Sequence, residues 1–292
     1  MDILTASMTH VQSLGVNIRQ EDWQIESTAE MLSGNDCIVV SATGTGKSLC
    51  FYLAAITLQQ KIFIVVCPLL NLMEDQVCRA EAFGIKAVAI NMASSQQDAG
   101  LVDCILNGQF ELVFVSPEWC VPHNKNFQAL VQSETFRKCI GGIVIDEAHL
   151  VHGWRTFRPH YEYLGLLCSF FPMAPVLAVS ATMTPYVCHC IHQSLAMNNA
   201  ACFIHRPIDR PNIYLAAVPI TKGVNSMHDL DFVVYDWLKS GSANHIPQMI
   251  IFMDSRKAVC DACNHLWDLV PEHWRYSDPL AIVEISTALS QK

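Results

Sequence analysis

The chain has 292 residues, of which 51% are hydrophobic, and its formal net charge is −9 at pH 7. This composition can supply the core of one large domain or two smaller ones, and no apolar run approaches the roughly 18 residues that cross a bilayer. The acidic balance argues against a protein that holds nucleic acid through a broad basic surface, because phosphate neutralisation needs lysine and arginine.

Residues 1–10 lack the charged and apolar regions of a signal peptide. We therefore expect a soluble intracellular protein, located in the nucleus if its source is eukaryotic. The thirteen cysteines are scattered along apolar segments, which favours reduced, mostly buried thiols over a disulfide framework.

Residues 21–32 are predicted to form an amphipathic helix that buries Trp23 for packing, with stacking on adenine as the alternative. Apolar segments then alternate with helical patterns, which indicates an α/β fold with a mostly parallel sheet and flanking helices. The predicted strands are 37–40, 62–67, 87–90, 112–116, 143–145 and 176–180. The apolar helix after Lys47, with Phe51 and Tyr52, is predicted to be core.

A glycine-bearing loop lies between the first predicted strand and the helix that follows, which is the context of a P-loop. Gly44 and Gly46 let backbone N–H groups turn toward phosphate oxygens. Lys47 can place its ammonium on the β- and γ-phosphates, and the Ser48 hydroxyl can hold Mg²⁺. The predicted nucleotide-binding residues of this loop are Ser41, Ala42, Thr43, Gly44, Thr45, Gly46, Lys47 and Ser48.

Two carboxylates, Asp146 and Glu147, follow the predicted strand 143–145. Asp146 can position hydrated Mg²⁺ together with Ser48, and Glu147 can orient or deprotonate the attacking water. A solvated acidic turn is the alternative for such a pair alone. After a P-loop at this distance, the pair indicates catalysis, and the two segments together predict a motor that uses a nucleoside triphosphate with Mg²⁺.

His149 and the segment Ser180-Ala-Thr182 are predicted to join the catalytic group. The P-loop, the carboxylates and Ser180 all follow strands, and α/β sheets bind ligands at the carboxyl ends of their strands. His149 can link the nucleotide site to Ser180 and Thr182, because an imidazole bridges two hydrogen-bond partners. The two hydroxyls can instead cap a helix that begins near Pro185.

The two prolines in residues 205–213 favour extended backbone and indicate an interdomain linker. The predicted organisation is a first domain at 1–205, a linker at 206–214 and a partial second α/β domain at 215–292. Its predicted elements are a helix at 227–239, a buried strand at 249–252 and a helix at 256–269.

Two clusters contain residue types that bind zinc. One is Cys188, His189, Cys190 and His192, and the other is Cys260, Cys263 and His265. Both lie within predicted helices, where only some of the side chains share a face. Structural cysteines and surface histidines are therefore the favoured interpretation, and stoichiometric zinc would contradict it.

Several segments, in the expected order, resemble helicase superfamily 2 and within it the RecQ-like DNA helicases. Residues 66–77, Val-Cys-Pro-Leu-Leu-Asn-Leu-Met-Glu-Asp-Gln-Val, resemble the second motif, and Ser116-Pro117-Glu118 resembles the next. Residues 209–213, Asp-Arg-Pro-Asn-Ile, and residues 250–256 resemble later motifs. Many superfamily 2 motors also have alanine or serine where Ser41 stands, and the resemblance implies that Gln24 reads adenine.

The most specific resemblance is Trp154-Arg-Thr-Phe-Arg-Pro-His-Tyr161, which is similar to the aromatic-rich loop that distinguishes RecQ proteins. It implies that Trp154 and Phe157 stack on bases of single-stranded DNA, with Pro68 as a further contact. Arg158 would bind a phosphate of the DNA and transmit the presence of the DNA strand to the carboxylates Asp146 and Glu147. A surface aromatic cluster under a loop is the alternative.

The resemblance implies RecA-like domains and a helicase that couples ATP hydrolysis to 3′-to-5′ movement on single-stranded or partly duplex DNA, with no membrane partner. The chain ends before the segments that supply the arginine finger in this family. We therefore expect ATP·Mg²⁺ binding with poor or no unwinding. An RNA helicase and a noncatalytic ATP-binding fragment are the alternatives. A metabolic P-loop kinase would explain neither residues 68–77 nor 154–161.

Overall fold

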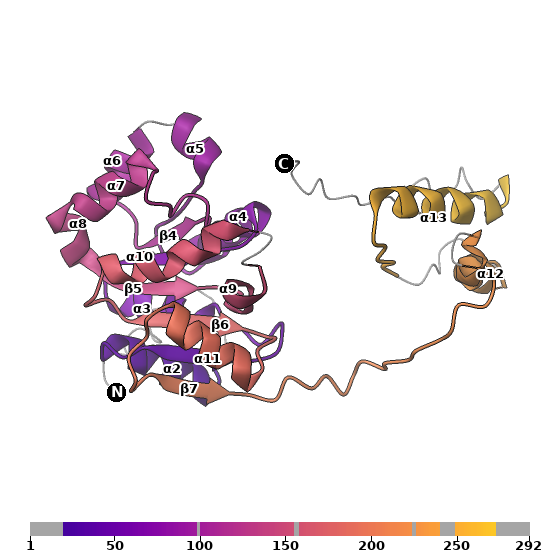
Figure 1. The fold of residues 1–292 in the computed structure, drawn as a ribbon, viewed down its shortest axis with the longest axis horizontal. Helices are drawn as coiled ribbons and strands as arrows, with labels where there is room; N and C mark the ends of the chain where they lie inside the picture. Colours follow the sequence, from indigo (N-terminus) through magenta and orange to yellow (C-terminus); the bar gives the residue numbers. More distant parts are fainter. Residues whose placement is uncertain (1–19, 98–99, 155–157, 224–225, 240–248, 273–292) are drawn as a thin grey trace. The chain divides into compact units, whose positions relative to one another are not determined.

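The computed structural model describes residues 20–97, 100–154, 158–223, 226–239 and 249–272 (Figure 1). The chain divides into two compact units, Met1–Asn212 and Ile213–Lys292, and each is described by itself. Within the described residues, no helix has the length and apolar character that crossing a membrane requires.

A parallel sheet forms the centre of the first unit, with the strand order β3-β4-β2-β5-β6-β1-β7. The strands are β1 Cys37–Val40, β2 Ile62–Val66, β3 Ala87–Ile90, β4 Leu112–Val115, β5 Ile140–Ile145, β6 Val176–Ser180 and β7 Cys202–His205. The predicted α/β fold is confirmed. All six predicted strands are present, β5 begins three residues earlier than predicted, and β7 was not predicted.

Helices connect the strands of the first unit. They are α2 Asp22–Leu32, α3 Leu49–Thr57, α4 Leu70–Ala82, α5 Met92–Gln97, α6 Gly100–Leu106, α7 Lys125–Gln132, α8 Glu134–Cys139, α9 His149–Gly153, α10 Leu164–Phe170 and α11 Pro185–Ser194, with the 3-10 helix η1 Pro159–Tyr163. Parallel strands need such crossover connections, which is why helices and strands alternate along the chain.

The sheet separates two hydrophobic cores. Successive strand residues point to opposite faces, so Ile38 belongs to one core and Val39 to the other. The first core includes residues of α7, α10 and α11, and the second includes residues of α2, α3 and α4. Trp23, Phe51 and Tyr52 are buried in the second core, as predicted. All thirteen cysteines are free thiols, and six of them are buried, fewer than the predicted majority.

Asp36, which precedes β1, ties together three segments that are distant in sequence. Its Oδ1 accepts a hydrogen bond from the Val176 N–H at 2.7 Å, at the start of β6. Its Oδ2 accepts one from the Asn198 N–H, also at 2.7 Å, in the connection that leads to β7. The carboxylate therefore fixes the strand that carries the P-loop between its two neighbours.

Replacing Asp36 with alanine is expected to lower the free energy of unfolding by about 2–4 kcal/mol, because a hydrogen bond to a charged group contributes about 1.5–3 kcal/mol. Urea denaturation followed by circular dichroism measures the change. Asp103→Ala, on the exposed surface of α6, is the matched control and should stay within about 0.5 kcal/mol of the parent. If the two variants were equally stable, the proposed role of Asp36 in holding β1 between its neighbouring strands would be wrong.

The second unit contains three described helices, η3 His228–Leu230, α12 Asp231–Lys239 and α13 Arg256–Leu269. The predicted helix at 256–269 is confirmed, whereas the one at 227–239 is split between η3 and α12. The predicted buried strand at 249–252 is wrong, because this segment forms no strand and Phe252 is 87% exposed. A strand is stable only beside a hydrogen-bonding neighbour, and the described part of this unit offers none.

Candidate functional site

Three of the predicted site segments meet at the carboxyl-terminal edge of the sheet. The P-loop follows β1, Asp146 follows β5, and Ser180 ends β6, which lies between those two strands. The Ser41 N–H donates to the Ser180 carbonyl at 3.1 Å, so the first residue of the P-loop is joined to the end of β6. The structure therefore brings together the residues that the sequence places at separate strand ends.

The P-loop is held by its own side chains. Gly44 and Gly46 both have φ of +79°, a conformation that side-chain-bearing residues rarely adopt. The Lys47 ammonium donates to the carbonyl oxygens of Ser41 at 3.1 Å and Ala42 at 3.0 Å. The Ser41 hydroxyl lies 2.9 Å from the Thr45 hydroxyl, which gives a serine at this position a local bonding role.

Gln24 supports the P-loop from α2. Its side chain is buried, and its Nε2 donates to the carbonyl oxygens of Thr45 at 2.9 Å and Gly46 at 3.1 Å. Its Oε1 accepts from the Glu21 N–H, so the same amide also caps α2. The sequence pattern indicated only a contact with adenine, whereas these bonds add a structural role in shaping the loop.

Ser48 is bonded to a residue that the sequence analysis did not assign to the site. The Gln76 amide of α4 donates to the Ser48 hydroxyl at 3.2 Å, and its carbonyl accepts from the Tyr52 hydroxyl. Gln76 thus connects the segment that resembles the second helicase motif with a predicted magnesium ligand. Its position within residues 66–77 was the only feature of the sequence that could have indicated that Gln76 belongs to the site.

The two carboxylates at the end of β5 have opposite environments. Burial, and next the charge of Glu147, raise the pKa of Asp146 to about 6. The hydrogen bond with His149 lowers the pKa of Glu147. A buried carboxylate beside a second one fits a divalent cation, which would relieve the cost of keeping Asp146 ionised. Asp146 and the Ser48 hydroxyl are therefore suitable ligands for Mg²⁺.

Glu147, His149 and Ser180 form a compact triangle. The His149 Nδ1 lies 2.7 Å from the Ser180 Oγ and 3.2 Å from the Glu147 Oε2, and the Ser180 hydroxyl donates to that oxygen at 3.3 Å. The Thr182 N–H donates to the Ser180 Oγ at 3.2 Å, so Thr182 joins the group through its backbone. The cap of α11 is the Thr184 hydroxyl, and the alternative in which Ser180 and Thr182 cap this helix is wrong.

Arg158 is the centre of a second cluster of predicted site residues. Its guanidinium contacts Glu118 through Nε at 2.8 Å and Nη2 at 2.6 Å, and Nη1 donates to the Pro68 carbonyl at 2.6 Å. It also lies over the rings of Trp154, at 5.3 Å, and Tyr161, at 5.6 Å. Three of the predicted nucleic-acid contacts, Pro68, Trp154 and Arg158, are thus adjacent, whereas Phe157 lies outside the described residues.

Residues 21–189 match the model of the DEAD/DEAH box helicase family, which is more than half of the chain. This chain belongs to that family. The P-loop and the carboxylates of the helicase domain lie within the matched residues.

The relatives of this helicase domain include RecQ-type proteins that are 31–39% identical to it, which confirms the resemblance to RecQ-like helicases. "ATP-dependent DNA helicase RecQ" of Haemophilus influenzae is 39% identical over 62% of this chain and 28% of its own length. "ATP-dependent helicase SGS1" of Saccharomyces cerevisiae is 31% identical over 80% of this chain and 16% of its own length. The chain thus spans about a third or less of these relatives.

Among solved structures, DUF1998 helicase MrfA bound to DNA and AMPPNP has a TM-score of 0.62 and 16% identity, and the match covers 92% of this chain and 38% of that one. At this identity the likeness shows the fold alone, and it agrees with the three-layer arrangement of the helicase domain.

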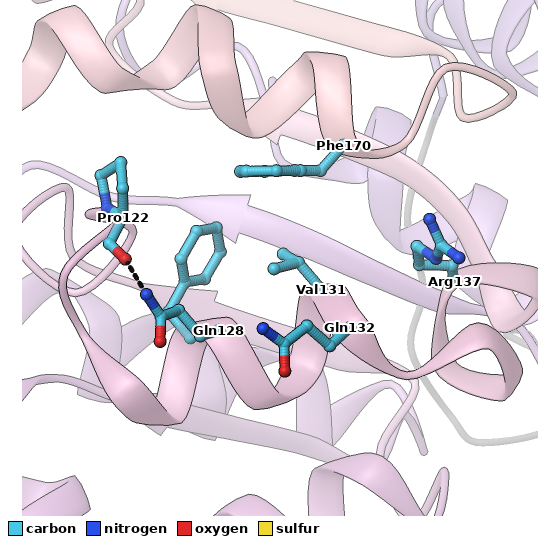
Figure 2. A pocket seen from close by; sticks show the side chains of 7 residues that line it. Pro122, Gln128, Val131, Gln132, Arg137 and Phe170 are labelled. Atoms are coloured by element: carbon cyan, nitrogen blue, oxygen red, sulfur yellow. Dashed lines mark hydrogen bonds between the residues drawn. The ribbon is translucent and has the colours of Figure 1, made fainter.

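Two other features of the helicase domain lie apart from the site. A cavity of about 400 Å³ between α7 and α10 is lined by Phe127, Val131 and Phe170, with Arg137 at its side (Figure 2). The cysteine and histidine cluster at 188–192 lies on α11, where His192 contacts the Asn198 carbonyl. Neither this cluster nor the cluster of Cys260, Cys263 and His265 forms a three-residue metal group from its own members within the described residues.

Gln24→Glu is expected to weaken ATP binding about tenfold or more, which corresponds to about 1.4 kcal/mol. The substitution keeps the acceptor for the Glu21 N–H but replaces the amide donor with a carboxylate that faces two carbonyl oxygens. Titration with a fluorescent ATP analogue measures the affinity. The control is Gln128→Glu on α7, whose amide donates to Pro122 (Figure 2). Equal affinity in the two variants would contradict the role of Gln24.

Proposed function

We propose that this chain is the motor part of a RecQ-type, ATP-dependent DNA helicase. It binds ATP with Mg²⁺ and couples hydrolysis to movement along single-stranded DNA and to unwinding of duplex DNA. The names of its relatives support ATP and DNA as substrates. The direction of movement, 3′ to 5′, rests on the resemblance of the motifs.

In the proposed nucleotide site, the P-loop amides and the Lys47 ammonium bind the phosphates, and Gln24 both shapes the loop and faces the adenine. Ser48 and Asp146 would hold Mg²⁺, which would neutralise charge on the phosphate oxygens. Glu147 accepts a proton from the attacking water or orients it. The low pKa of Glu147 keeps it in the ionised form that this task requires.

The observation that carries the proposal is the short distance in the chain between the catalytic carboxylate and the aromatic segment. Only Ala148 separates Glu147 from α9, and Trp154 directly follows α9. This helix has five residues and is about 7.5 Å long. A strand of DNA that contacts Trp154 and Arg158 would therefore act on one end of a short helix that begins at His149, two residues after Glu147.

We further propose that residues 1–205 are the first RecA-like domain, 206–214 the linker and 215–292 part of a second such domain. The division of the chain between Asn212 and Ile213 supports a boundary near this linker. A DNA substrate also implies that the protein works where DNA is kept, which is the nucleus in a eukaryotic source.

The test is ATP hydrolysis by the 292-residue chain alone, with single-stranded DNA and with RNA of the same sequence. Lys47→Ala provides the blank. Selective stimulation by DNA is the expected result. Equal or better stimulation by RNA would favour an RNA helicase, and the absence of Lys47-dependent hydrolysis in all three conditions would favour a noncatalytic ATP-binding fragment. Either outcome would overturn the proposal.

A further inference from the structure

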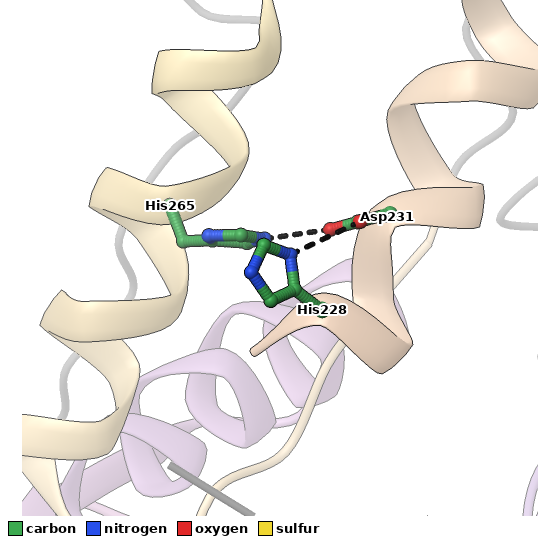
Figure 3. Close-up of side chains that lie close together, drawn as sticks. All are labelled: His228, Asp231 and His265. Atoms are coloured by element: carbon green, nitrogen blue, oxygen red, sulfur yellow. Dashed lines mark hydrogen bonds and ion pairs between the residues drawn. The ribbon is translucent and has the colours of Figure 1, made fainter. Parts of the chain in front are cut away.

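The second unit contains a group of three side chains that are typical metal ligands, His228, Asp231 and His265 (Figure 3). They come from three elements, since His228 begins η3, Asp231 begins α12 and His265 lies in α13. One ligand atom from each residue lies within 4.8 Å of the other two. In the part of the chain that the structure describes, this is the one group of three or more such residues.

The two imidazoles approach opposite oxygens of the same carboxylate. The His228 Nδ1 lies 3.2 Å from the Asp231 Oδ2, and the His265 Nε2 lies 2.7 Å from the Asp231 Oδ1. The two rings are 5.0 Å apart between centroids and almost perpendicular. One nitrogen of each ring thus lies within hydrogen-bonding distance of the carboxylate, which brings three potential ligand atoms together (Figure 3).

We propose that His228, Asp231 and His265 bind a zinc ion. Two imidazole nitrogens and one carboxylate oxygen are ligands that Zn²⁺ prefers, whereas Mg²⁺ and Ca²⁺ prefer oxygen ligands throughout. Zinc–ligand bonds of about 2.1 Å place tetrahedral ligands about 3.4 Å apart. The separations in this group range from 2.7 Å to no more than 4.8 Å, so small rotations of the side chains reach that spacing.

The surroundings allow an ion to enter and leave room for a fourth ligand. The His228 side chain is 55% exposed, whereas the Asp231 side chain is only 13% exposed. The group is therefore open to solvent on one side, where a water molecule completes the coordination. Zinc takes the two ring nitrogens in their unprotonated form, so binding releases any protons that they carry.

The described part of the second unit has a small core, which gives such a site a structural purpose. The described hydrophobic cluster of this unit has only three buried members, Val234, Leu266 and Val270. Small structures with little buried apolar surface are commonly stabilised by disulfides or a metal ion. All thirteen cysteines of the chain are free thiols, so disulfides do not serve here. A zinc ion would join η3 and α12 to α13 directly.

The competing explanation is a carboxylate that receives hydrogen bonds from two histidines, with no metal. The cysteines present a second difficulty, because thiolates are also zinc ligands and the chain has thirteen cysteines. Cobalt distinguishes these ligand sets, because thiolate ligands give Co²⁺ an intense charge-transfer absorption that imidazole and carboxylate ligands do not give. The test therefore uses both metals.

The experiment is titration of the chelator-treated 292-residue chain with Zn²⁺, followed by calorimetry, and with Co²⁺, followed by absorption. His228→Gln and Asp231→Asn remove a ligand with little change in shape, and circular dichroism checks that each variant remains folded. His189→Gln, on the exposed surface of α11, is the matched control. His228 is the most exposed of the three ligands, which makes its variant the least prone to unfold.

The expected result is one equivalent of zinc in the parent and in His189→Gln, with the loss of this equivalent in both ligand variants. Co²⁺ should show weak bands without thiolate charge transfer. Zinc should raise the melting temperature of the parent and of His189→Gln, but not that of the two ligand variants. Equal zinc binding by all four proteins, a thiolate-type cobalt spectrum that survives the substitutions, or no stoichiometric binding by the parent would overturn the proposal.

Discussion

Replacing Glu147 with glutamine is expected to reduce ATP hydrolysis by about 10² to 10⁴-fold while ATP still binds, because general-base catalysis contributes rate factors of this size. Glutamine preserves the shape and can still accept a hydrogen bond from the Ser180 hydroxyl or from His149. It cannot accept a proton from water. Single-turnover hydrolysis measures the rate, and titration with a fluorescent ATP analogue measures the binding.

Glu162→Gln is the matched control, since this glutamate lies on the exposed surface of η1. Its turnover should equal that of the parent. A Glu147→Gln variant with more than a tenth of the parental rate would exclude Glu147 as the proton acceptor. Loss of ATP binding in the same variant would instead mean that the Glu147–His149–Ser180 triangle shapes the nucleotide site.

Replacing Arg158 with alanine is expected to abolish stimulation of ATP hydrolysis by single-stranded DNA, so that the ratio of rates with and without DNA falls toward one. The guanidinium contacts Pro68, Glu118 and the Trp154 ring at the same time. A DNA phosphate would compete with Glu118 for this guanidinium, and the exchange would move the segment that follows α9. The loss of stimulation is measured as the rate of ATP hydrolysis at increasing concentrations of single-stranded DNA and at several salt concentrations.

Arg158→Lys should lose most of the stimulation as well, because an ammonium lacks the rigid fork that places Nε and Nη2 on the Glu118 Oε1 and cannot stack like a planar guanidinium. The control is Arg137→Ala, beside the cavity between α7 and α10 (Figure 2). Combining Arg158→Ala with Glu118→Gln in a double-mutant cycle gives the coupling between the two side chains. Parental stimulation in Arg158→Ala would show that the aromatic segment does not report DNA binding.

Most of the sheet could be predicted from the sequence because its strands are buried on both faces and form continuous apolar runs. The start of β5 escaped this pattern, since Gly141 and Gly142 contribute no apolar side chain. The structure gives the reason for them: a Cβ on Gly142 would lie 2.9 Å from the Met31 Cε, and one on Gly141 would lie 2.9 Å from the Phe63 ring. Packing against Met31 of α2 and Phe63 of β2 leaves little room for a side chain at these two positions.

The strand predictions were wrong where tertiary contacts determine whether a segment forms a strand. β7 has only four residues, and Phe203 is half exposed, so it gives no continuous buried pattern although β1 pairs with it along its full length. Residues 249–252 have the opposite character, since they are strongly apolar but have no described strand beside them. Hydrophobicity alone cannot distinguish a strand inside a sheet from an apolar segment without a partner.

The candidate site was predictable in its positions but not in its contacts. Strand ends and glycines located the P-loop and the carboxylates, because each feature is local in the sequence. The bonds from Gln24 to the P-loop and from Gln76 to Ser48 join residues more than twenty positions apart, and no local pattern encodes them. The pairing of Arg158 with Glu118 likewise depends on two loops that meet only in the folded domain.

The position of β1 between β6 and β7 determines when the nucleotide site can form during synthesis. Cys37 is one of the early residues of the chain, yet its partners in the sheet are Leu177 and Cys202. Contacts between such distant residues form slowly, because the intervening chain must first be ordered. A ribosome therefore has to release almost the entire first unit before the strand that carries the P-loop gains its neighbours. Until then its four apolar residues stay available to chaperones and to aggregation.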